Sequence, residues 1–439
     1  MNDMNIIGSG LKAGLIGAKL GHSLSPQIHR LLGDYEYRLY ELEEGDIPGF
    51  LDKMRSGSGP SAINVTIPYK QTVMPYLDGI SETASSVGAV NTVVARCGRL
   101  YGYVTDPVGF SCMLDRAGIE ISGRKCLCLG DGGAAKSVLE VLRARKAGGI
   151  TVISRRSGTD NYDNISRHYD AEVIVNCTPV GMYPKNGDEL FELGNFHRLE
   201  ACADLIYNPA VTAFLRDADR CGAKTVNGLT MLTAQALRSR DIFLGITDDD
   251  IRPFSTGEMS EISDVTSAVR RDMLSVGLVG MPGSGKTSVG RRLSELTGRE
   301  LIDTDAMIEE KAGMSIPEIF SRFGEERFRD IESECVAEAS KLGGKIISYG
   351  GGAVLREKNR MLIKQNSAVF WLERPPHLLS REGRPLSGGK SDDEMREMYN
   401  KRCAAYECAS DARIICSGGE ETIDSAAKRI MRMTGIPEI

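Results

Sequence analysis

The chain has 439 residues, of which 41% are hydrophobic and 26% are charged, and its formal net charge is −6. This length exceeds one ordinary hydrophobic core, so two or three domains of a soluble globular protein are expected. The acidic balance argues against nucleic acid as the main partner, and no apolar run is long enough to span a bilayer. The first ten residues lack the pattern of a signal peptide, and the 11 cysteines never show C-x-x-C spacing. We therefore expect free thiols and a cytoplasmic location, whereas the composition leaves the oligomeric state open.

The first 106 residues alternate short strands and helices. The apolar runs Gly14–Ile16 and Ala62–Ile67 predict strands, and the pattern of Pro26–Leu32 predicts a helix. A later helical segment, Met231–Leu244, follows the second domain. We expect residues 1–106 to form one α/β domain that is completed by about residues 232–245.

A second domain is expected over residues 107–231. Short apolar runs alternate there with helical patterns, which is the rhythm of a doubly wound parallel sheet. The first helix of this domain is predicted at Ala134–Lys146. The predicted strands are Lys125–Leu129, Ile150–Ser154, Glu172–Asn176, Ala201–Ile206 and Lys224–Val226.

A change of composition separates these domains from the rest of the chain. Residues 246–272 are acidic and polar, and Pro253 and Gly257 interrupt any periodicity, so this segment is interpreted as a linker with room for one short helix. A further α/β domain with a parallel sheet is expected over residues 273–439. Its glycine motif differs from that of the second domain, so the halves do not look like a duplication.

A glycine-rich loop joins the first strand of the second domain to its first helix. The loop Gly130-Asp131-Gly132-Gly133-Ala134 stands where the pyrophosphate of a dinucleotide would meet a helix N-terminus, although a plain turn is the alternative. The next strand ends in Ser154-Arg155-Arg156 and not in an acidic residue. Two guanidinium groups suit a 2′-phosphate, so the loop favours NADP(H), and solvated surface charges are the alternative.

Four polar clusters upstream form a first catalytic candidate. They bring hydroxyls, amides, one lysine and one aspartate, which suit the hydroxyls and carboxylate of a small ring acid. Lys70 and Asp106 together can pass a proton to a carbonyl as hydride arrives. Singly, each cluster has a plainer explanation, such as a helix start, a turn or a surface lysine. The clusters are His22–Pro26, Asn64–Lys70, Gly88–Thr92 and Thr105-Asp106.

Taken together, these clusters resemble shikimate dehydrogenase over about residues 12–245. The likeness continues in Asn176–Met182, Asp204–Pro209 and Asn227–Gln235. It implies a substrate domain followed by a Rossmann NADP domain, with the pyrophosphate on Gly130–Ala134 and the nicotinamide near Gly228. It also implies that Lys70 transfers the proton. The substrate contacts that it implies are Ser23 and Ser25, which would hold the carboxylate, with Thr66, Asn91, Asp106, Tyr207 and Gln235.

The chain departs from that family at two points. The usual Asn-Thr-Asp-Gly is Val104-Thr105-Asp106-Pro107 here, so an amide is lost and proline stiffens the loop. The usual Asn-Arg-Thr after the second strand is Ser154-Arg155-Arg156. The change at Val104 and Pro107 leaves Lys70 and Asp106 in place. The change at Ser154-Arg155-Arg156 leaves a phosphate clamp intact.

A second glycine motif lies behind the linker. Gly280-Met281-Pro282-Gly283-Ser284-Gly285-Lys286-Thr287 matches the phosphate loop G-x-x-x-x-G-K-[ST], between the apolar run Val276–Val279 and a helical pattern that starts at Ser288. Its backbone N–H groups can surround phosphate oxygens at a helix N-terminus. Lys286 can neutralise the terminal phosphates of ATP, and the Thr287 hydroxyl can ligate Mg²⁺.

Further polar positions surround this phosphate loop in the sequence. Asp303 and Asp305 place two carboxylates at a predicted strand end, where one can support Mg²⁺ and the other an acceptor hydroxyl. Gly350–Gly352 is a loop where a small ligand could approach the backbone, or a flexible turn. Arg384 lies in a short polar segment, Ser380–Ser391, that is interpreted as a lid.

This half resembles shikimate kinase over about residues 274–433. The likeness implies that shikimate contacts Asp305, Arg329, Gly351 and Arg402, with the two arginines on its carboxylate. It implies that Lys286 and Arg384 stabilise the transferred phosphoryl group, and that Thr287 and Asp303 fix Mg²⁺. The nucleotide contacts would also include Gly283, Ser284, Gly285 and Ser288. The lid departs from the family, because Arg-Pro-Leu-Leu is Arg384-Pro385-Leu386-Ser387 here.

The two resemblances imply consecutive reactions that share one intermediate. 3-Dehydroshikimate and NADPH would give shikimate, and shikimate and ATP would give shikimate 3-phosphate, within chorismate biosynthesis. One alternative is that one half is relaxed toward quinate or another hydroxylated ring acid. Another alternative, a non-catalytic sensor module, is disfavoured because Lys70, Asp106, Lys286, Thr287 and Asp305 are all present.

Overall fold

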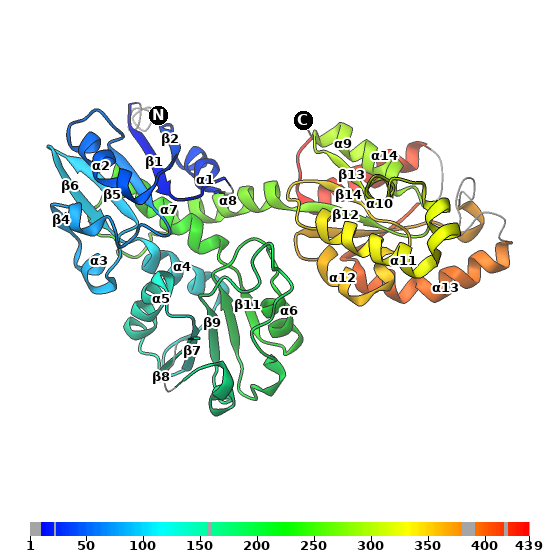
Figure 1. Cartoon of the computed structure of the whole chain (residues 1–439), viewed down its shortest axis with the longest axis horizontal. Coiled ribbons are helices and arrows are strands. Elements are labelled where there is room, and N and C mark those ends of the chain that lie inside the picture. Colours follow the sequence, from blue (N-terminus) through cyan, green and yellow to red (C-terminus); the bar gives the residue numbers. More distant parts are fainter. Residues whose placement is uncertain (1–9, 22, 156–159, 380–390, 417–419, 439) are drawn as a thin grey trace. The chain divides into compact units, whose positions relative to one another are not determined.

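The computed structural model describes residues 10–21, 23–155, 160–379, 391–416 and 420–438. The chain divides into two compact units: residues 1–207 with 212–269, and residues 208–211 with 270–439. Each unit is treated by itself below (Figure 1). Within the described ranges, every helix is too short or too polar to cross a membrane.

The first sheet of the first unit is mixed and has the strand order β2-β1-β3-β5-β6-β4. Its strands are β1 (Lys12–Gly17), β2 (Glu36–Glu41), β3 (Ala62–Val65), β4 (Gly79–Ile80), β5 (Thr92–Arg96) and β6 (Arg99–Tyr103). β1 lies parallel to β2 and β3, whereas β5 lies antiparallel to β3 and β6. The sequence rhythm missed the β5–β6 hairpin. Its two turn residues, Cys97 and Gly98, both have positive φ, as a tight hairpin turn requires.

Helices cover both faces of this first sheet. They are α1 (Ser25–Leu32), α2 (Ile47–Arg55), α3 (Glu82–Val87) and α7 (Leu229–Phe243). On one face, Ile47 and Leu51 of α2 pack with Ile63 and Val65 of β3. On the other face, Ile242 of α7 packs with apolar residues of β1, β3 and β5. The late helix α7 therefore belongs to this early domain.

The second sheet of the first unit is entirely parallel and has the order β11-β10-β9-β7-β8. Along β7, Cys126 and Cys128 face α4 and α5, whereas Leu127 and Leu129 face α6, so both faces are buried (Figure 1). Each predicted strand is present, with ends shifted by at most two residues. The elements are β7 (Lys125–Leu129), β8 (Gly149–Ile153), β9 (Val173–Asn176), β10 (Ala201–Asp204), β11 (Lys224–Val226), α4 (Asp106–Ala117), α5 (Gly133–Ala144) and α6 (Ala213–Arg220).

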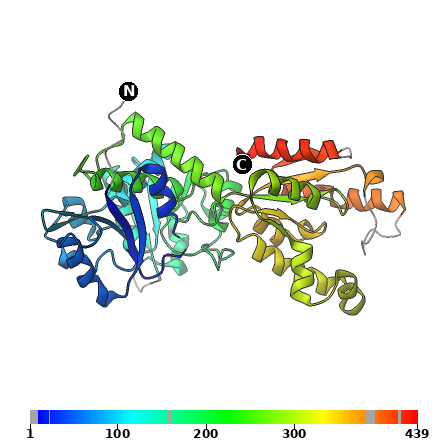
Figure 2. The same ribbon diagram turned by 90° about the horizontal axis from the view of Figure 1, so that it is seen from above.

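The segment that was interpreted as a linker contains an 18-residue helix, α8 (Thr256–Met273). Figure 2 shows it as one long helix. Its side chains Ile262, Val265 and Val269 are buried, and Thr266 is hydrogen-bonded to Thr233 of α7 at 2.6 Å. The segment was expected to be a linker with room for one short helix, and the helix is instead long. The three buried apolar positions, spaced at i, i+3 and i+7, form a helical stripe that the polar composition hid. Residues 256–269 are part of the first unit.

The second unit has one parallel sheet of order β13-β14-β12-β15-β16. α9 and α14 pack on one face of it, and α11, α12 and α13 pack on the other. The strands are β12 (Ser275–Val279), β13 (Leu301–Asp303), β14 (Ile346–Ser348), β15 (Ser367–Glu373) and β16 (Ala412–Ile415). The helices are α9 (Lys286–Thr297), α10 (Thr304–Ala312), α11 (Ile316–Ala339), α12 (Glu357–Ile363), α13 (Asp392–Ala409) and α14 (Glu420–Thr434).

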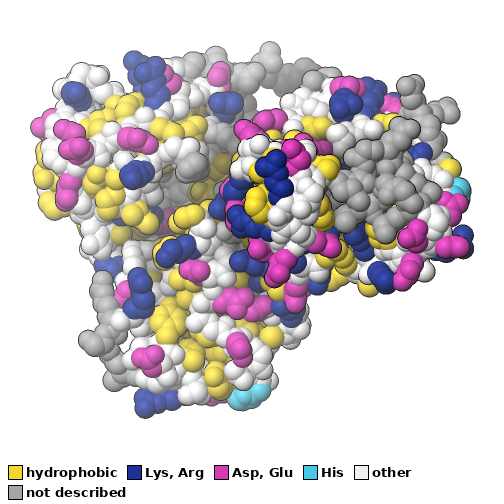
Figure 3. All heavy atoms as spheres, turned by 45° about the vertical axis from the view of Figure 1, so that its right-hand side comes forward, with side chains coloured by type: hydrophobic (Ala, Val, Ile, Leu, Met, Phe, Trp, Pro, Cys, Tyr) yellow, Lys and Arg dark blue, Asp and Glu magenta, His cyan; other side chains and the backbone are white. Residues whose placement is uncertain are grey.

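Charged side chains of both signs are intermixed on the face of the molecule shown in Figure 3. Neither positive nor negative charge dominates that face.

Candidate active sites

Lys70 and Asp106 form an ion pair in the first unit. Lys70 follows β3, Asp106 begins α4, and Lys70 Nζ lies 2.6 Å from Asp106 Oδ2. The side chains are 20% and 11% exposed, so the pair is shielded but still reachable. An ammonium group held by a carboxylate at a partly buried position can give a proton to an oxygen that lies beside it.

A buried amide holds the carboxylate of this pair. Asn91 Nδ2 donates to the second oxygen of Asp106 at 2.9 Å, and Asn91 Oδ1 accepts from the Thr105 N–H at 2.9 Å. Gln235 of α7 joins the same network, because its Oε1 accepts from the Thr105 hydroxyl at 3.3 Å. The structure therefore brings four predicted positions together: Lys70, Asp106, Asn91 and Gln235.

Ser239 is a member of this network that the sequence did not reveal. Its hydroxyl accepts from Asn64 Nδ2 at 2.9 Å and is hydrogen-bonded to the hydroxyls of Thr92 and Thr105. The Tyr37 hydroxyl donates to Asn64 Oδ1 at 2.8 Å. A signal was available, since Ser239 lies one helical turn after Gln235 and so shares its face.

The other predicted substrate positions lie beyond strands: Ser23 is in the loop after β1, Ser25 begins α1, and Thr66 directly follows β3. The N–H of Thr66 donates to the carbonyl of Ile16, and the N–H of Ser25 donates to Ser23 Oγ at 3.2 Å. Tyr207 follows β10, and burial raises its pKa. Among the residues that the structure describes, no hydrogen bond joins Ser23, Ser25 or Thr66 to Lys70 or Asp106.

The departures from the family have simple places in the fold. Val104 is fully buried in the core of the first sheet. Pro107 lies in the first turn of α4, where a backbone N–H has no acceptor within the helix, so proline is tolerated there. Neither change disturbs the ion pair.

The glycine loop of the second sheet has the geometry expected of a dinucleotide site. The N–H of Gly130 donates to Ile153 at the end of β8, and α5 begins at Gly133. A Cβ at Gly132 or Gly133 would meet nothing within 4 Å, so the loop borders open space. Asp131 and Arg155 are exposed, and Ala134 and Ser154 are half-buried. The second predicted arginine, Arg156, lies outside the described residues.

Two buried polar residues brace the loops beside this site. Asn176 ends β9 and Asp204 ends β10, and Asn176 Nδ2 donates to Asp204 Oδ1 at 3.0 Å. Asp204 also accepts from the Thr212 hydroxyl at 2.7 Å. Burial raises the pKa of Asp204 to about 6, although these hydrogen bonds oppose the shift. Gly228 closes the same edge, since a Cβ there would lie 2.0 Å from the carbonyl oxygen of Leu205.

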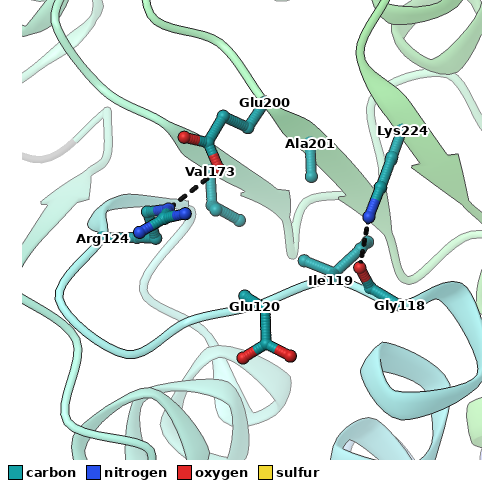
Figure 4. A pocket seen from close by; sticks show the side chains of 8 residues that line it. All are labelled: Gly118, Ile119, Glu120, Arg124, Val173, Glu200, Ala201 and Lys224. Carbon is teal, nitrogen blue, oxygen red and sulfur yellow. Dashed lines mark hydrogen bonds and ion pairs between the residues drawn. The ribbon is translucent and has the colours of Figure 1, made fainter.

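A pocket of about 120 Å³ lies at the opposite, amino-terminal edge of the second sheet (Figure 4). Arg124 is paired with Glu200 at 2.8 Å there, and Lys224 donates to the Gly118 carbonyl at 2.6 Å. Arg124 and Lys224 therefore already have partners within the pocket. Ligands of open α/β sheets bind at the carboxyl edge, so this pocket is not the dinucleotide site.

The phosphate loop of the second unit connects β12 to α9. Lys286 Nζ donates to the carbonyls of Gly280 and Met281 at 2.9 and 3.1 Å, which holds the ammonium against the loop. Gly285 caps α9 with positive φ, so the helix N-terminus opens directly onto the loop. The buried Ser284 hydroxyl has no hydrogen-bond partner within the described part of the chain. An unsatisfied donor in this position fits a phosphate oxygen of ATP.

A hydroxyl and a carboxylate meet beside this loop. Thr287 Oγ1 donates to Asp303 Oδ2 at 2.9 Å, and Asp303 Oδ1 caps α10 by accepting from the Asp305 N–H. Asp305 therefore lies in the first turn of α10. The sequence had suggested that it lies at the end of the preceding strand. The reason is that the strand ends at Asp303, whose side chain begins the helix.

Two predicted arginines lie nearby and are largely buried. Arg329 is held on α11 by Glu332 at 2.8 Å and by Glu325 at 3.0 Å. Burial raises the pKa of Glu332, although the guanidinium of Arg329 opposes the shift. Arg402 of α13 donates from Nη1 to the Gly351 carbonyl at 3.2 Å.

The triple-glycine loop lies close to an aspartate, an arginine and a phosphate-loop residue of this site. A Cβ at Gly350 would lie 2.6 Å from Asp305 Oδ1, and one at Gly351 would lie 2.7 Å from the ring of Pro282 in the phosphate loop. A Cβ at Gly352 would lie 1.9 Å from Arg329 Nη1. Only glycine allows this backbone to pass between the acidic, basic and phosphate-binding groups. The predicted lid residue Arg384 lies outside the described residues, and Ser288 is exposed on α9.

These sites define a class of enzyme: a nucleotide-dependent oxidoreductase joined in one chain to a P-loop phosphotransferase. Residues 15–93 match the family model of the shikimate dehydrogenase substrate binding domain, and residues 282–434 match that of shikimate kinase.

More than half of the chain matches known proteins over almost their whole length. The chain is 38% identical over 253 residues to the shikimate dehydrogenase (NADP(+)) of Clostridium perfringens strain SM101, an alignment that spans 54% of this chain and 93% of the relative. A solved structure of a chorismate mutase/shikimate 5-dehydrogenase fusion protein from Clostridium acetobutylicum matches with 36% identity and a TM-score of 0.54, over 59% of this chain and 96% of that one. A shikimate 5-dehydrogenase from Thermus thermophilus in complex with NADP(H) and shikimate matches with 28% identity and a TM-score of 0.51, over 58% and 99%. The chain belongs to the shikimate dehydrogenase family, and it carries a shikimate kinase domain behind it.

Proposed function

We propose that this protein catalyses two consecutive reactions of the shikimate pathway in the cytoplasm. Its first unit reduces 3-dehydroshikimate to shikimate with NADPH, and its second unit phosphorylates shikimate with ATP to shikimate 3-phosphate. The observation that carries the proposal is that one chain holds both a complete Lys70–Asp106 pair and a complete phosphate loop. The two matched families share shikimate as product and as substrate.

In the dehydrogenase reaction, NADPH supplies the hydride and Lys70 supplies the proton. The 2.6 Å contact with Asp106 would orient the Lys70 ammonium group toward the carbonyl oxygen as that oxygen becomes a hydroxyl. Asn91 is hydrogen-bonded to Asp106, and Gln235 is hydrogen-bonded to Thr105. Both amides would also offer polar groups to the ring hydroxyls of the substrate. Ser23, Ser25, Thr66 and Tyr207 complete the proposed substrate site.

The dinucleotide would lie on the loop Gly130–Ala134, with its nicotinamide toward Gly228. The open space at Gly132 and Gly133 leaves room for a pyrophosphate at the N-terminus of α5. Ser154, Arg155 and Arg156 would hold the 2′-phosphate.

In the kinase reaction, ATP supplies the phosphoryl group, and the chain's own residues position the acceptor. Asp305 would accept a hydrogen bond from the reacting hydroxyl, while Arg329 and Arg402 would hold the carboxylate. Lys286 and Arg384 would balance the charge on the phosphoryl oxygens. Thr287 and Asp303 would hold Mg²⁺, which commonly takes one or two protein oxygens and completes its shell with water and phosphate.

A coupled assay tests this proposal. The intact chain is given 3-dehydroshikimate, NADPH, ATP and Mg²⁺, and both NADPH consumption and ADP release are followed. We expect one ADP for each NADPH. ADP release that stays absent while NADPH is consumed would show that the second unit is not a shikimate kinase.

A further inference from the structure

The carbonyl oxygen of Gly351 accepts two hydrogen bonds, and both come from α13. Tyr406 Oη donates to it at 2.5 Å and Arg402 Nη1 donates to it at 3.2 Å. The two residues are four apart, so they share one face of the helix. Tyr406 was not among the residues that the sequence indicated.

We propose that Tyr406 is a positioning residue for the kinase reaction, which holds the Gly351 carbonyl so that the Arg402 guanidinium stays available for the carboxylate of the acceptor. This inference rests on the proposed function, in which Arg402 binds that carboxylate.

The Gly351 carbonyl and the carboxylate of the acceptor compete for one guanidinium group. Arginine binds a carboxylate best through two parallel N–H groups, and every donor committed elsewhere reduces that choice. The neutral hydroxyl of Tyr406 makes the shorter bond to Gly351, so Arg402 shares the carbonyl and does not have to satisfy it alone. Without the Tyr406 hydroxyl, Arg402 would be the only one of these two donors left on the Gly351 carbonyl. The carboxylate of the acceptor would then have to draw the guanidinium away from that carbonyl.

The surroundings of Tyr406 make it a fixed donor. The residue is fully buried, and burial raises its pKa to about 12, so the hydroxyl keeps its proton. Its ring lies against the ring of Trp371 with centroids 5.8 Å apart and planes at 23°. A phenylalanine would keep these ring contacts and would lose the hydroxyl, with its hydrogen bond to Gly351 and its interaction with Arg402.

The position of Gly351 explains why the effect falls on the acceptor. The neighbouring glycines pass directly beside Asp305 and Arg329, the other proposed acceptor contacts. Gly351 itself lies beside Pro282 of the phosphate loop, but the Lys286 ammonium group is fixed by the carbonyls of Gly280 and Met281. A less firmly held glycine loop would therefore displace the acceptor contacts more than it displaces Lys286.

Full-length Tyr406→Phe tests the proposal. The kinase kcat and the KM values for shikimate and ATP are measured, with dehydrogenase activity in the same chain as a fold control. We expect the shikimate KM to rise roughly threefold to tenfold, which is the loss of one hydrogen bond, while kcat and the ATP KM change less than about twofold. An unchanged shikimate KM, or an equal rise for both substrates, would overturn the proposal.

A matched control lies on the same helix. Tyr399→Phe also removes a hydroxyl, the one that donates to Glu373, and its ring also lies near Trp371. This variant should leave the shikimate KM unchanged, and a similar rise would contradict a specific role of Tyr406.

A direct binding measurement separates this inference from the proposed function. Trp371 is the only tryptophan in the chain, so its fluorescence reports on the second unit during a titration with shikimate. If the unmodified chain lacks kinase activity, the proposed function fails, and the titration still compares its shikimate Kd with that of the Tyr406→Phe variant. Equal Kd values in an active kinase, or no binding by the unmodified chain, would refute the role of Tyr406.

Discussion

The side-chain amide of Asn64 on β3 donates a hydrogen bond of 2.9 Å to the hydroxyl of Ser239 on α7, 175 residues further along the chain. Ser239 is fully buried and also bonds the hydroxyls of Thr92 and Thr105. Thr105 directly precedes Asp106, so this one hydroxyl ties the helix α7 to the proposed catalytic pair.

We predict that Ser239→Ala lowers dehydrogenase kcat/KM by roughly tenfold. The substitution leaves the Asn64 amide and two buried hydroxyls short of a partner, which costs about 1–3 kcal/mol, and some of that cost falls on the placement of Asp106. Steady-state kinetics with 3-dehydroshikimate and NADPH measures it. Ser263→Ala, a half-buried serine of α8 that bonds Arg116, is the control and should leave kcat/KM unchanged. Equal kinetics of Ser239→Ala and the unmodified chain would contradict the prediction.

The sequence predicted the residues that lie in recognisable motifs, but it did not reveal Ser239 or Tyr406. Short motifs drew attention to Lys70, Asp106 and Lys286, because each of these residues lies in a short run of polar or glycine-rich sequence that stands out from its surroundings. Tyr406 acts on a partner 55 residues away and Ser239 on a partner 175 residues away, and only the packed fold supplies these pairings. Regular strands were predicted because apolar runs mark them. Helix α8 was missed because its three buried residues are spread through a polar segment.

We predict that Lys70→Ala and Lys286→Ala each remove one activity and spare the other. The two residues belong to different units and to separate hydrogen-bond networks. Loss of a proton donor or of a phosphate-binding charge should lower the corresponding kcat by at least about 100-fold. Separate assays of dehydrogenase and kinase decide the matter. A folded variant in which both activities stop would refute the assignment of separate sites.

A pH dependence follows from Asp204, whose pKa is about 6 in the folded chain because it is buried. Its pKa in an unfolded chain is about 3.9, so between these values the folded state binds the additional proton. The contribution of Asp204 to the free energy of unfolding of the first unit is therefore fully present below about pH 4. It is lost as the pH rises through 6. The full difference is on the order of 3 kcal/mol.

Asp204→Asn should remove this fall, because an amide does not titrate. Urea unfolding at pH 4 to 7 can be followed by hydrogen exchange of peptides from β9 and β10, which separates the first unit from the second. Asp163→Asn, at an exposed position, is the control and should keep the slope of the unmodified protein. An identical slope in the Asp204→Asn variant would show that this carboxyl is not the source.

The cofactor preference should rest on the two arginines after β8. The unmodified protein is expected to prefer NADPH strongly to NADH, because no acidic residue stands at this strand end. Replacing both Arg155 and Arg156 by alanine should weaken NADPH binding by roughly 2–4 kcal/mol and leave NADH binding nearly unchanged. Dissociation constants for both cofactors measure it. Equal use of NADPH and NADH by the unmodified protein would rule this explanation out.

The last prediction concerns the joining of the two enzymes in one chain. We expect that shikimate is released into solution between the reactions and that the connection only fixes equal amounts of the two sites. Linking raises local concentration when two modules bind one partner at the same time, but a small anion that has left its first site diffuses away freely. The apolar side of α8 is already used within the first unit, since Ile262, Val265 and Val269 are buried there.

Full-length variants can test this without cutting the chain, which matters because a cut near Gly257 would fall inside α8. An equimolar mixture of Lys70→Ala and Lys286→Ala chains carries each active site on a different molecule. With 3-dehydroshikimate, NADPH, ATP and Mg²⁺, the lag before steady ADP release is compared between this mixture and the unmodified protein at equal concentrations of each active site. Equal lags, and equal dilution of labelled product by added unlabelled shikimate, are expected for free diffusion. A lag that disappears only in the unmodified protein, together with labelled product that added unlabelled shikimate does not dilute, would demonstrate direct transfer and overturn the prediction.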